Sequence, residues 1–294
     1  MNLKLSLVIG ILCIAFSPIL VKLAEAGPVT SAFYRIFIGW IVLAPYCIAT
    51  KKLSISKKDL LLTLVGGVIF ATDIAVWNMS LVITSATIST LVANLAPVWV
   101  GLMSYFILKK KSGLLFWIGT FIAIVGMIVL VGISHIIHLE FNLGLILALA
   151  ASFLYSLYLM ITREVMQRVH TLTFMFYNML AASVVLLIVC SIQGNSFISF
   201  PASTWVCFAV MGLICQLTGW ITINYSLKYI ESTKVAVALL SQTVLAGILA
   251  VFMLSERLTA TEILGSLIVL AGIAVTFLKS TPHLGHLPGK RLYK

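Results

Sequence analysis

Long apolar segments separated by short polar junctions make up almost the whole sequence. Each is about as long as the roughly 20 residues that a helix needs to cross a bilayer core. They cover residues 3–23, 29–50, 60–80, 85–108 and 114–133, and then 142–162, 171–192, 203–227, 233–254 and 259–278. Turn formers or clustered lysines mark the junctions, as at Gly27-Pro28 and Lys57-Lys58-Asp59. This pattern predicts an all-α integral membrane protein with ten transmembrane helices.

The second half of the chain repeats the first at a spacing of 146 residues. Asn78-Met79-Ser80-Leu81 aligns with Asn224-Tyr225-Ser226-Leu227, and the register gives 12 identities over the 54 pairs from 78 to 131. Five segments per half is an odd number, so the two halves would enter the membrane in opposite directions. We therefore predict two inverted five-helix repeats, at 1–135 and 136–279, followed by a basic tail at 280–294. Inverted repeats around a site near the membrane midplane are typical of secondary transporters.

Composition excludes a soluble domain and several kinds of site. Hydrophobic residues make up 62% of the chain and charged residues 9%, against about 25% charged in soluble proteins. The five cysteines all fall in apolar segments without CxxC spacing, so neither a disulfide framework nor a zinc site is indicated. No glycine-rich phosphate loop is present, which disfavours an ATP-driven pump.

The basic excess follows the membrane topology. The chain carries 19 Lys and Arg against 8 acids. With the N-terminus inside and ten spans, 16 of the 19 basic residues fall on the cytoplasmic side. The excess therefore indicates orientation, not nucleic-acid binding. We expect both termini to be cytoplasmic, in a plasma membrane of the bacterial inner-membrane type.

Two charged residues, Arg35 and Asp73, lie deep inside predicted spans. A charge in hydrocarbon costs from about 3 to more than 10 kcal/mol unless it is paired or hydrated. Arg35 in the second span and Asp73 in the third lie at similar depths from the outer side, which predicts an ion pair or a shared polar network. Either a static pair or a gating and coupling element would fit, and protons are a candidate coupling ion.

Polar and aromatic residues concentrate in spans three, four, eight and nine, and span six adds Tyr155. A water-filled cavity between the halves would satisfy amides and hydroxyls that lipid cannot, although static contacts between helices are the alternative. The candidates for the cavity lining are Trp77, Asn78, Asn94, Tyr155, Gln216, Trp220, Asn224, Tyr225 and Gln242, with Thr90, Trp99 and Thr243 in the same spans. Pro97 should kink span four, as a hinge or as a fixed bend.

Other motifs indicate scaffold or solvated loops. Gly119 with Gly126, and Gly265 with Gly272, lie seven residues apart and suit close helix packing. His135 and His138 near Glu140, and His283 with His286, lack a third ligand in suitable spacing. We predict no metal and no cofactor.

Several short motifs resemble the drug/metabolite transporter superfamily, and within it the EamA group. Leu254-Ser255-Glu256-Arg257-Leu258-Thr259 resembles the acidic turn after the ninth span, and Phe33-Tyr34-Arg35-Ile36-Phe37 resembles the aromatic-arginine start of the second. Ser85-Ala86-Thr87 and Ser232-Thr233 resemble the small-hydroxyl starts of spans four and nine. In the first half Lys109-Lys110-Lys111 replaces the acidic turn.

The resemblance implies a transporter of small metabolites, more often an exporter than an importer. The mostly neutral and aromatic candidate residues favour amphipathic or zwitterionic solutes such as amino acids. We therefore expect a non-enzymatic secondary transporter that exports such solutes by alternating access. A nutrient uptake permease and a non-transporting membrane scaffold are the alternatives. The sequence does not determine the substrate, the energy coupling or whether the protein is a monomer or a homodimer.

Overall fold

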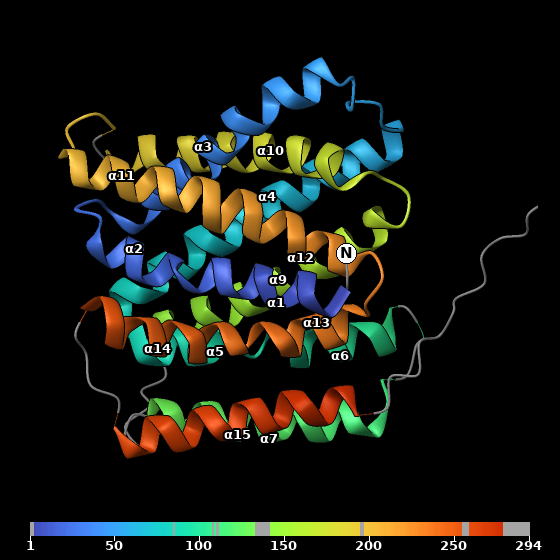
Figure 1. Cartoon of the computed structure of the whole chain (residues 1–294), viewed down its shortest axis with the longest axis vertical. Coiled ribbons are helices and arrows are strands. Elements are labelled where there is room, and N and C mark those ends of the chain that lie inside the picture. The colour runs from blue at the N-terminus through green and yellow to red at the C-terminus, as the bar shows by residue number, and fades with distance from the viewer. Residues whose placement is uncertain are drawn as a thin grey trace, which may run out of the picture.

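The computed structural model describes residues 3–84, 86–107, 109, 112–132, 142–194, 197–254 and 259–278, and their regular elements are all helices (Figure 1). The first half contains α1 (Leu3–Ala15), α2 (Ser17–Leu23), α3 (Pro28–Ala49), α4 (Lys57–Ile83), α5 (Ala86–Ala93), α6 (Ala96–Phe106) and α7 (Leu114–Val131). The second half contains α9 (Leu143–Met166), α10 (Thr171–Ile192), α11 (Ala202–Val210), η1 (Met211–Gly219), α12 (Trp220–Leu227), α13 (Ser232–Leu239), α14 (Ser241–Leu254) and α15 (Ala260–Phe277).

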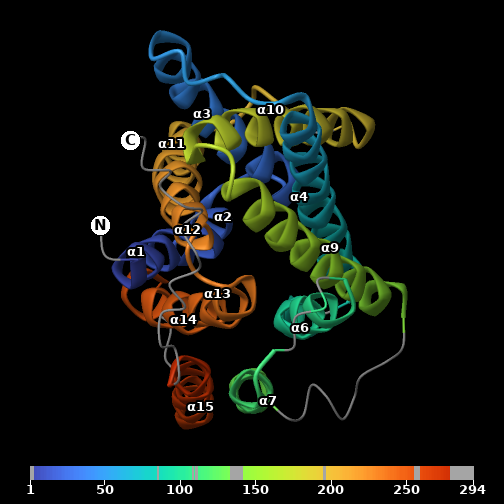
Figure 2. The ribbon, with the colours of Figure 1, turned by 90° about the vertical axis from the view of Figure 1, so that its right-hand side faces the viewer.

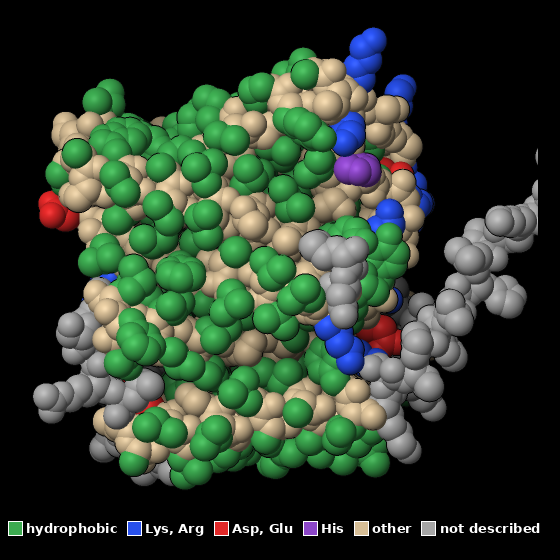
Figure 3. Space-filling model, in the orientation of Figure 1, with side chains coloured by type: hydrophobic (Ala, Val, Ile, Leu, Met, Phe, Trp, Pro, Cys, Tyr) green, Lys and Arg blue, Asp and Glu red, His purple; other side chains and the backbone are tan. Residues whose placement is uncertain are grey.

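These elements form ten apolar helical units long enough to cross a membrane, which confirms the predicted number. Four units are interrupted: α1 continues into α2, α5 into α6, α11 through η1 into α12, and α13 into α14. Large apolar side chains cover much of the outer face in Figure 3. A helix that is apolar all round needs either a protein core or lipid around it. The outer surface therefore suits a bilayer.

Polar residues at the helix starts explain several boundaries. The Ser56 hydroxyl accepts a hydrogen bond from the Asp59 backbone N–H at the start of α4, and the Asn142 side chain does the same for Leu145 in α9. Thr259 and Glu262 form a reciprocal capping box at the start of α15. Such caps satisfy N–H groups that have no partner inside the helix.

The fourth unit of each half is broken at equivalent places. α5 ends at Ala93 and α6 begins at Ala96, while α13 ends at Leu239 and α14 begins at Ser241. With the 146-residue spacing, Asn94 corresponds to Leu240. Pro97 lies in the first turn of α6, so the expected bend occurs as a break just before it. The second break has Thr243 at the proline's position, so proline alone does not cause the pair of breaks.

The third units differ between the halves. α4 is a continuous α-helix, whereas the middle of its counterpart, η1, is a π-helix of nine residues. The Thr218 hydroxyl donates to the Leu213 carbonyl, five residues back. Single π-turns within α-helices are often found at functional sites. Asp73 in α4 corresponds to Gly219, the last residue of η1.

α7 and α15 pack as an antiparallel pair beside the other helices (Figures 1 and 2). A Cβ added to Gly126 would lie 2.5 Å from the Val269 nitrogen, and one added to Gly119 would lie 2.5 Å from the Gly272 carbonyl oxygen. Gly119 of α7 thus contacts Gly272 of α15, and Gly126 contacts Gly265, as expected for antiparallel helices. The glycines predicted as packing residues form this contact, which only small residues permit.

Basic side chains gather at one end of the molecule (right-hand side of Figure 3). This end, the basic end, contains the starts of α1 and α4, the end of α9 and the end of α12. Arg168 forms an ion pair with Asp59 at 2.9 Å. Gln167 donates to the Lys228 carbonyl at 2.6 Å, and Arg163 to the Ile230 carbonyl at 3.2 Å. These contacts, the basic-end network, connect α4, the end of α9 and the segment after α12.

Several sequence predictions fall outside the described residues. They are His135, His138 and Glu140, His283 and His286, the side chain of Thr87, and the segment Ser255-Glu256-Arg257. The proposed boundary at 135/136 and the basic tail at 280–294 also lie outside them.

Candidate functional site

A cavity of about 340 Å³ lies between the two halves of the chain. Residues from α1, α2, α3, α4, α5 and α6 line it, together with residues from α9, α12, α13 and α14. The lining residues on the first-half helices and on α9 lie either near the middle of each helix or in the half farther from the basic end. The lining on α12 and α13, such as Trp220 and Ala236, lies in the half nearer the basic end, so the cavity spans the middle of the helices.

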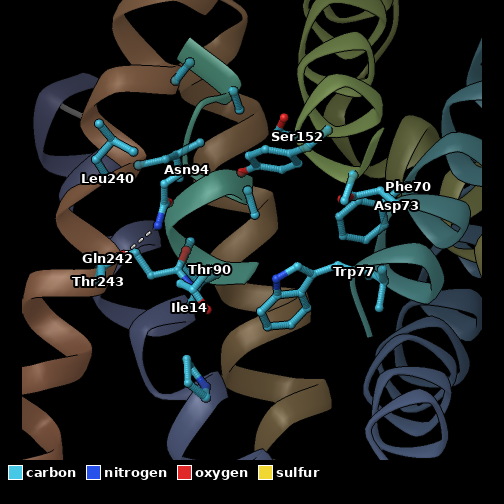
Figure 4. A pocket seen from close by; sticks show the side chains of 18 of the residues that line it. Ile14, Phe70, Asp73, Trp77, Thr90, Asn94, Ser152, Leu240, Gln242 and Thr243 are labelled. Atoms are coloured by element: carbon cyan, nitrogen blue, oxygen red, sulfur yellow. Dashed lines mark hydrogen bonds between the residues drawn. The ribbon is translucent and has the colours of Figure 1, made fainter. Parts of the chain in front are cut away.

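One face of α4 forms a wall of the cavity. Phe70, Asp73 and Trp77 are spaced three and four residues apart, which places them on the same side of a helix. Figure 4 shows the three side chains together on this helix. Neither a hydrogen bond nor an ion pair joins Asp73 to any other described residue. The indole N–H of Trp77 is likewise buried without a partner among the described residues.

The opposite wall is neutral and polar. Asn94, at the break between α5 and α6, donates from Nδ2 to Oγ1 of Thr243 in α14 at 3.5 Å (Figure 4). Thr90 and Gln242 also line the cavity. These side chains come from both halves of the chain and lie close to the helix breaks at Asn94 and Leu240.

Aromatic rings form a further part of the lining. The ring of Trp220 lies 5.1 Å from that of Phe70 and 6.4 Å from that of Tyr155, both edge-on. Tyr158 packs behind them, 5.6 Å from Trp220, and is buried. Trp99 does not line the cavity but donates to the Ser152 hydroxyl, which does. Rings arranged in this way offer large apolar surfaces and faces that attract cations.

Of the two arrangements predicted for Arg35 and Asp73, an ion pair or a shared polar network, the structure contradicts the ion pair. Nε of Arg35 donates to Oε1 of Gln216 at 3.0 Å, and Nη1 donates to the Ser17 hydroxyl at 2.9 Å. No ion pair joins Arg35 to Asp73 in the described part of the chain. Both side chains nevertheless line the same cavity. Arg35 has closer partners because Ser17 starts α2 and Gln216 lies in η1 next to α3.

Most of the predicted site residues are brought together, and four are not. The residues that line the cavity are Arg35, Asp73, Trp77, Asn94, Pro97, Tyr155, Trp220 and Gln242. Gln216 is buried beneath it and holds Arg35. Asn78 and Asn224 are buried elsewhere in the helix interfaces. Tyr225 packs on Tyr229 toward the basic end.

Their helix positions explain these exceptions. Asn224 lies four residues beyond Trp220, one turn closer to the basic end, and donates to the Met175 sulfur. Phe70 and Ser152 line the cavity but were not predicted. Phe70 could have been found from its spacing to Asp73, whereas Ser152 carries no signal that distinguishes it from other small residues of α9.

No group of three His, Cys, Asp or Glu side chains that could hold a metal ion occurs among the residues of known placement. None of the five cysteines forms a disulfide bond.

Comparison with known proteins gives the family. The model of the EamA-like transporter family matches twice, at residues 4–132 and 142–278. The chain is 21% identical over 294 residues to the uncharacterized transporter YdfC of Bacillus subtilis, covering 98% of this chain and 96% of that protein. An uncharacterized transporter of Archaeoglobus fulgidus is 21% identical over 248 residues, covering 83% and 85%.

A solved crystal structure shares the fold. Its TM-score is 0.79 at 18% identity, covering 94% of this chain and 97% of the other. Likeness at that identity bears on the fold alone. The two family matches together span most of the sequence, and each includes five of the ten candidate spans. The chain therefore belongs to the EamA-like transporter family.

Proposed function

We propose that the protein is a secondary transporter that exports small amphipathic metabolites, such as amino acids, across the plasma membrane. The two repeats are inverted, and both termini are cytoplasmic. The solute occupies the cavity between the repeats, which opens alternately to the two sides. The observation that carries this proposal is the cavity itself, because polar and aromatic side chains from both halves converge in a region that would otherwise be apolar.

The antiparallel pairing of α7 and α15 supports the inverted arrangement. α7 covers Leu114–Val131 and α15 covers Ala260–Phe277. Their first residues, and likewise their last residues, are 146 positions apart, which is the repeat spacing. Equivalent helices that run in opposite directions are what a two-fold axis in the membrane plane generates.

Contacts at the basic end are consistent with alternating access. The ion pair Arg168–Asp59 and the bonds of Gln167 and Arg163 connect helices on that side of the cavity. With the basic end in the cytoplasm, the basic-end network would close the inner side of the cavity. Solute movement then requires this network to separate.

Counterflow in proteoliposomes tests the function. Vesicles that contain the purified protein and a high concentration of an unlabelled amino acid should take up the same labelled amino acid transiently. A panel of aromatic, aliphatic and cationic amino acids defines the preference, and an imposed pH gradient tests for proton coupling. Loading from cells that overproduce the protein distinguishes export from uptake. Flux no greater than in protein-free vesicles for the whole panel would favour a membrane scaffold.

A further inference from the structure

The charged residues in the cavity differ in how they are satisfied. Arg35 has two hydrogen-bond partners, one on α2 and one on η1. Asp73 lines the same cavity and has neither a hydrogen bond nor an ion pair to another described residue, although Tyr155 interacts with it electrostatically. An unpaired carboxylate at membrane depth is costly, and such residues usually mark an ion or substrate pathway. In its ionised form, Asp73 is therefore stabilised by a cation that enters the cavity.

The surroundings of Asp73 are suited to a particular kind of cation. Phe70 and Trp77 flank it on the same face of α4 (Figure 4), and the ring of Trp220 packs against Phe70 at 5.1 Å. A carboxylate between aromatic faces favours an ammonium group on an apolar body, because the carboxylate pairs with the charge and the rings bind both parts. Small metal cations need several oxygen ligands at once, and Asp73 is the only carboxylate in this lining.

The remaining lining fits the rest of such a solute. Thr90, Asn94 and Gln242 supply neutral donors and acceptors across the cavity from Asp73 (Figure 4). Ile14, Leu239 and Leu240 add apolar surface. Arg35 is the only cation of the lining and is already held by Ser17 and Gln216. This environment provides little compensation for a solute whose dominant charge is negative.

We infer that Asp73 binds the protonated amino group of the transported solute, with Phe70 and Trp77 on either side of it. This inference rests on the proposed function and adds to it the chemical class of the substrate. The substrate is an amphipathic amine, with or without a neutral polar group at its other end.

Equilibrium binding to the purified full-length protein in detergent tests this site without requiring transport. The probes are radiolabelled phenethylamine and radiolabelled 2-phenylethanol, which share the aromatic body and differ in the ammonium group. Wild type should bind phenethylamine. Asp73→Asn should weaken that binding about tenfold or more, a change that corresponds to about 1.4 kcal/mol, and should leave 2-phenylethanol binding unchanged. Asp73→Glu should retain most of the affinity.

The control is Glu25→Gln, which removes an exposed carboxylate between α2 and α3; it should bind both probes as wild type does. Three results would overturn the inference: no binding of phenethylamine to wild type, equal binding to Asp73→Asn, or an equal loss for both probes. The ratio of the affinities for the two probes within one variant guards against misfolding, since a misfolded protein loses binding of both. If Asp73→Asn loses both, binding of the probes to Asp73→Glu decides whether the carboxylate is needed. If the predicted binding pattern is observed but the protein transports no solute, the proposed function fails. If the protein transports solute but does not show this binding pattern, only the inference about Asp73 fails.

Discussion

Arg35 holds three helices together at the edge of the cavity. It lies on α3 and reaches the first residue of α2 and the π-helical segment η1. Gln216 is only 2% exposed, so its side-chain oxygen depends on this guanidinium. A charged donor to a buried amide contributes more to stability than a neutral one. We expect Arg35 to fix the position of η1 relative to α2.

Replacing Arg35 with Ala should destabilise the protein by about 1–3 kcal/mol, because it leaves the buried Gln216 oxygen without a donor. Thermal unfolding in one detergent measures the effect. Gln216→Ala is the matched variant. In a double-mutant cycle the two losses should sum to more than the loss in the double variant, and strict additivity would contradict the contact.

His170 gives a pH dependence with a definite sign. Burial, and then the positive charges of Lys52 and Lys228, lower the pKa of His170 below its ordinary value. Its Nδ1 accepts the Leu172 N–H at the start of α10, which only the neutral ring can do. The folded state therefore resists a proton that the unfolded chain accepts near pH 6.5.

Stability from His170 should thus be complete above about pH 6.5 and decline as the pH falls below it. His170→Asn keeps a good N-cap but does not titrate. We expect the unfolding temperature of wild type to fall more between pH 7.5 and 5.5 than that of the variant. Parallel pH profiles would contradict the assignment.

Single residues also show where sequence reasoning stops. The depth of Arg35 and Asp73 could be predicted, because residue number along a helix gives height at about 1.5 Å per residue. Their rotation about the helix axes could not, since it depends on how neighbouring helices pack. For the same reason Asn224 and Asn78 were expected in the cavity but lie in helix interfaces, while Phe70 was missed.

At the scale of helices, the contact between α7 and α15 depends on glycine. A methyl group at Gly126 would lie 2.5 Å from the Val269 nitrogen and 2.9 Å from the Gly265 carbonyl oxygen. Backbone atoms cannot rotate away as side chains do, so the helices would have to separate.

Gly126→Ala should therefore lower the unfolding temperature clearly. Gly113→Ala is the control, because a Cβ there meets nothing within 4 Å. Overpacking of this kind costs roughly 1–3 kcal/mol. Equal unfolding temperatures for the two variants would show that the contact is looser than described.

The helices were largely predictable and their interruptions were not. Apolar length and turn residues located all ten spans, and the glycine spacing identified the α7–α15 contact. The break at Leu240 has no proline before it, and no residue of η1 (Met211–Gly219) distinguishes its sequence as π-helical. Tertiary context can override local preference in this way.

At the scale of the whole molecule, orientation can be tested at two exposed serines. Ser54 follows α3 near the basic end, and Ser203 lies in the first turn of α11 at the other. Each is changed to Cys in a chain whose native cysteines are Ala. A membrane-impermeant maleimide should label Ser203→Cys in intact cells, and Ser54→Cys only after permeabilisation. The reverse pattern would contradict the proposed orientation.

Solute counterflow with the cavity selectively filled tests the central claim most directly. Ala246 lines the cavity, so Ala246→Trp should occupy the space that the solute needs. Val206 on α11 is 62% exposed on the outer surface, so Val206→Trp adds similar bulk where lipid would lie. In proteoliposomes, wild type and Val206→Trp should accumulate labelled solute. Ala246→Trp should lose most of that flux, while an unfolding temperature close to that of wild type shows that the variant is folded. Equal flux in all three would mean that the solute does not pass through this cavity.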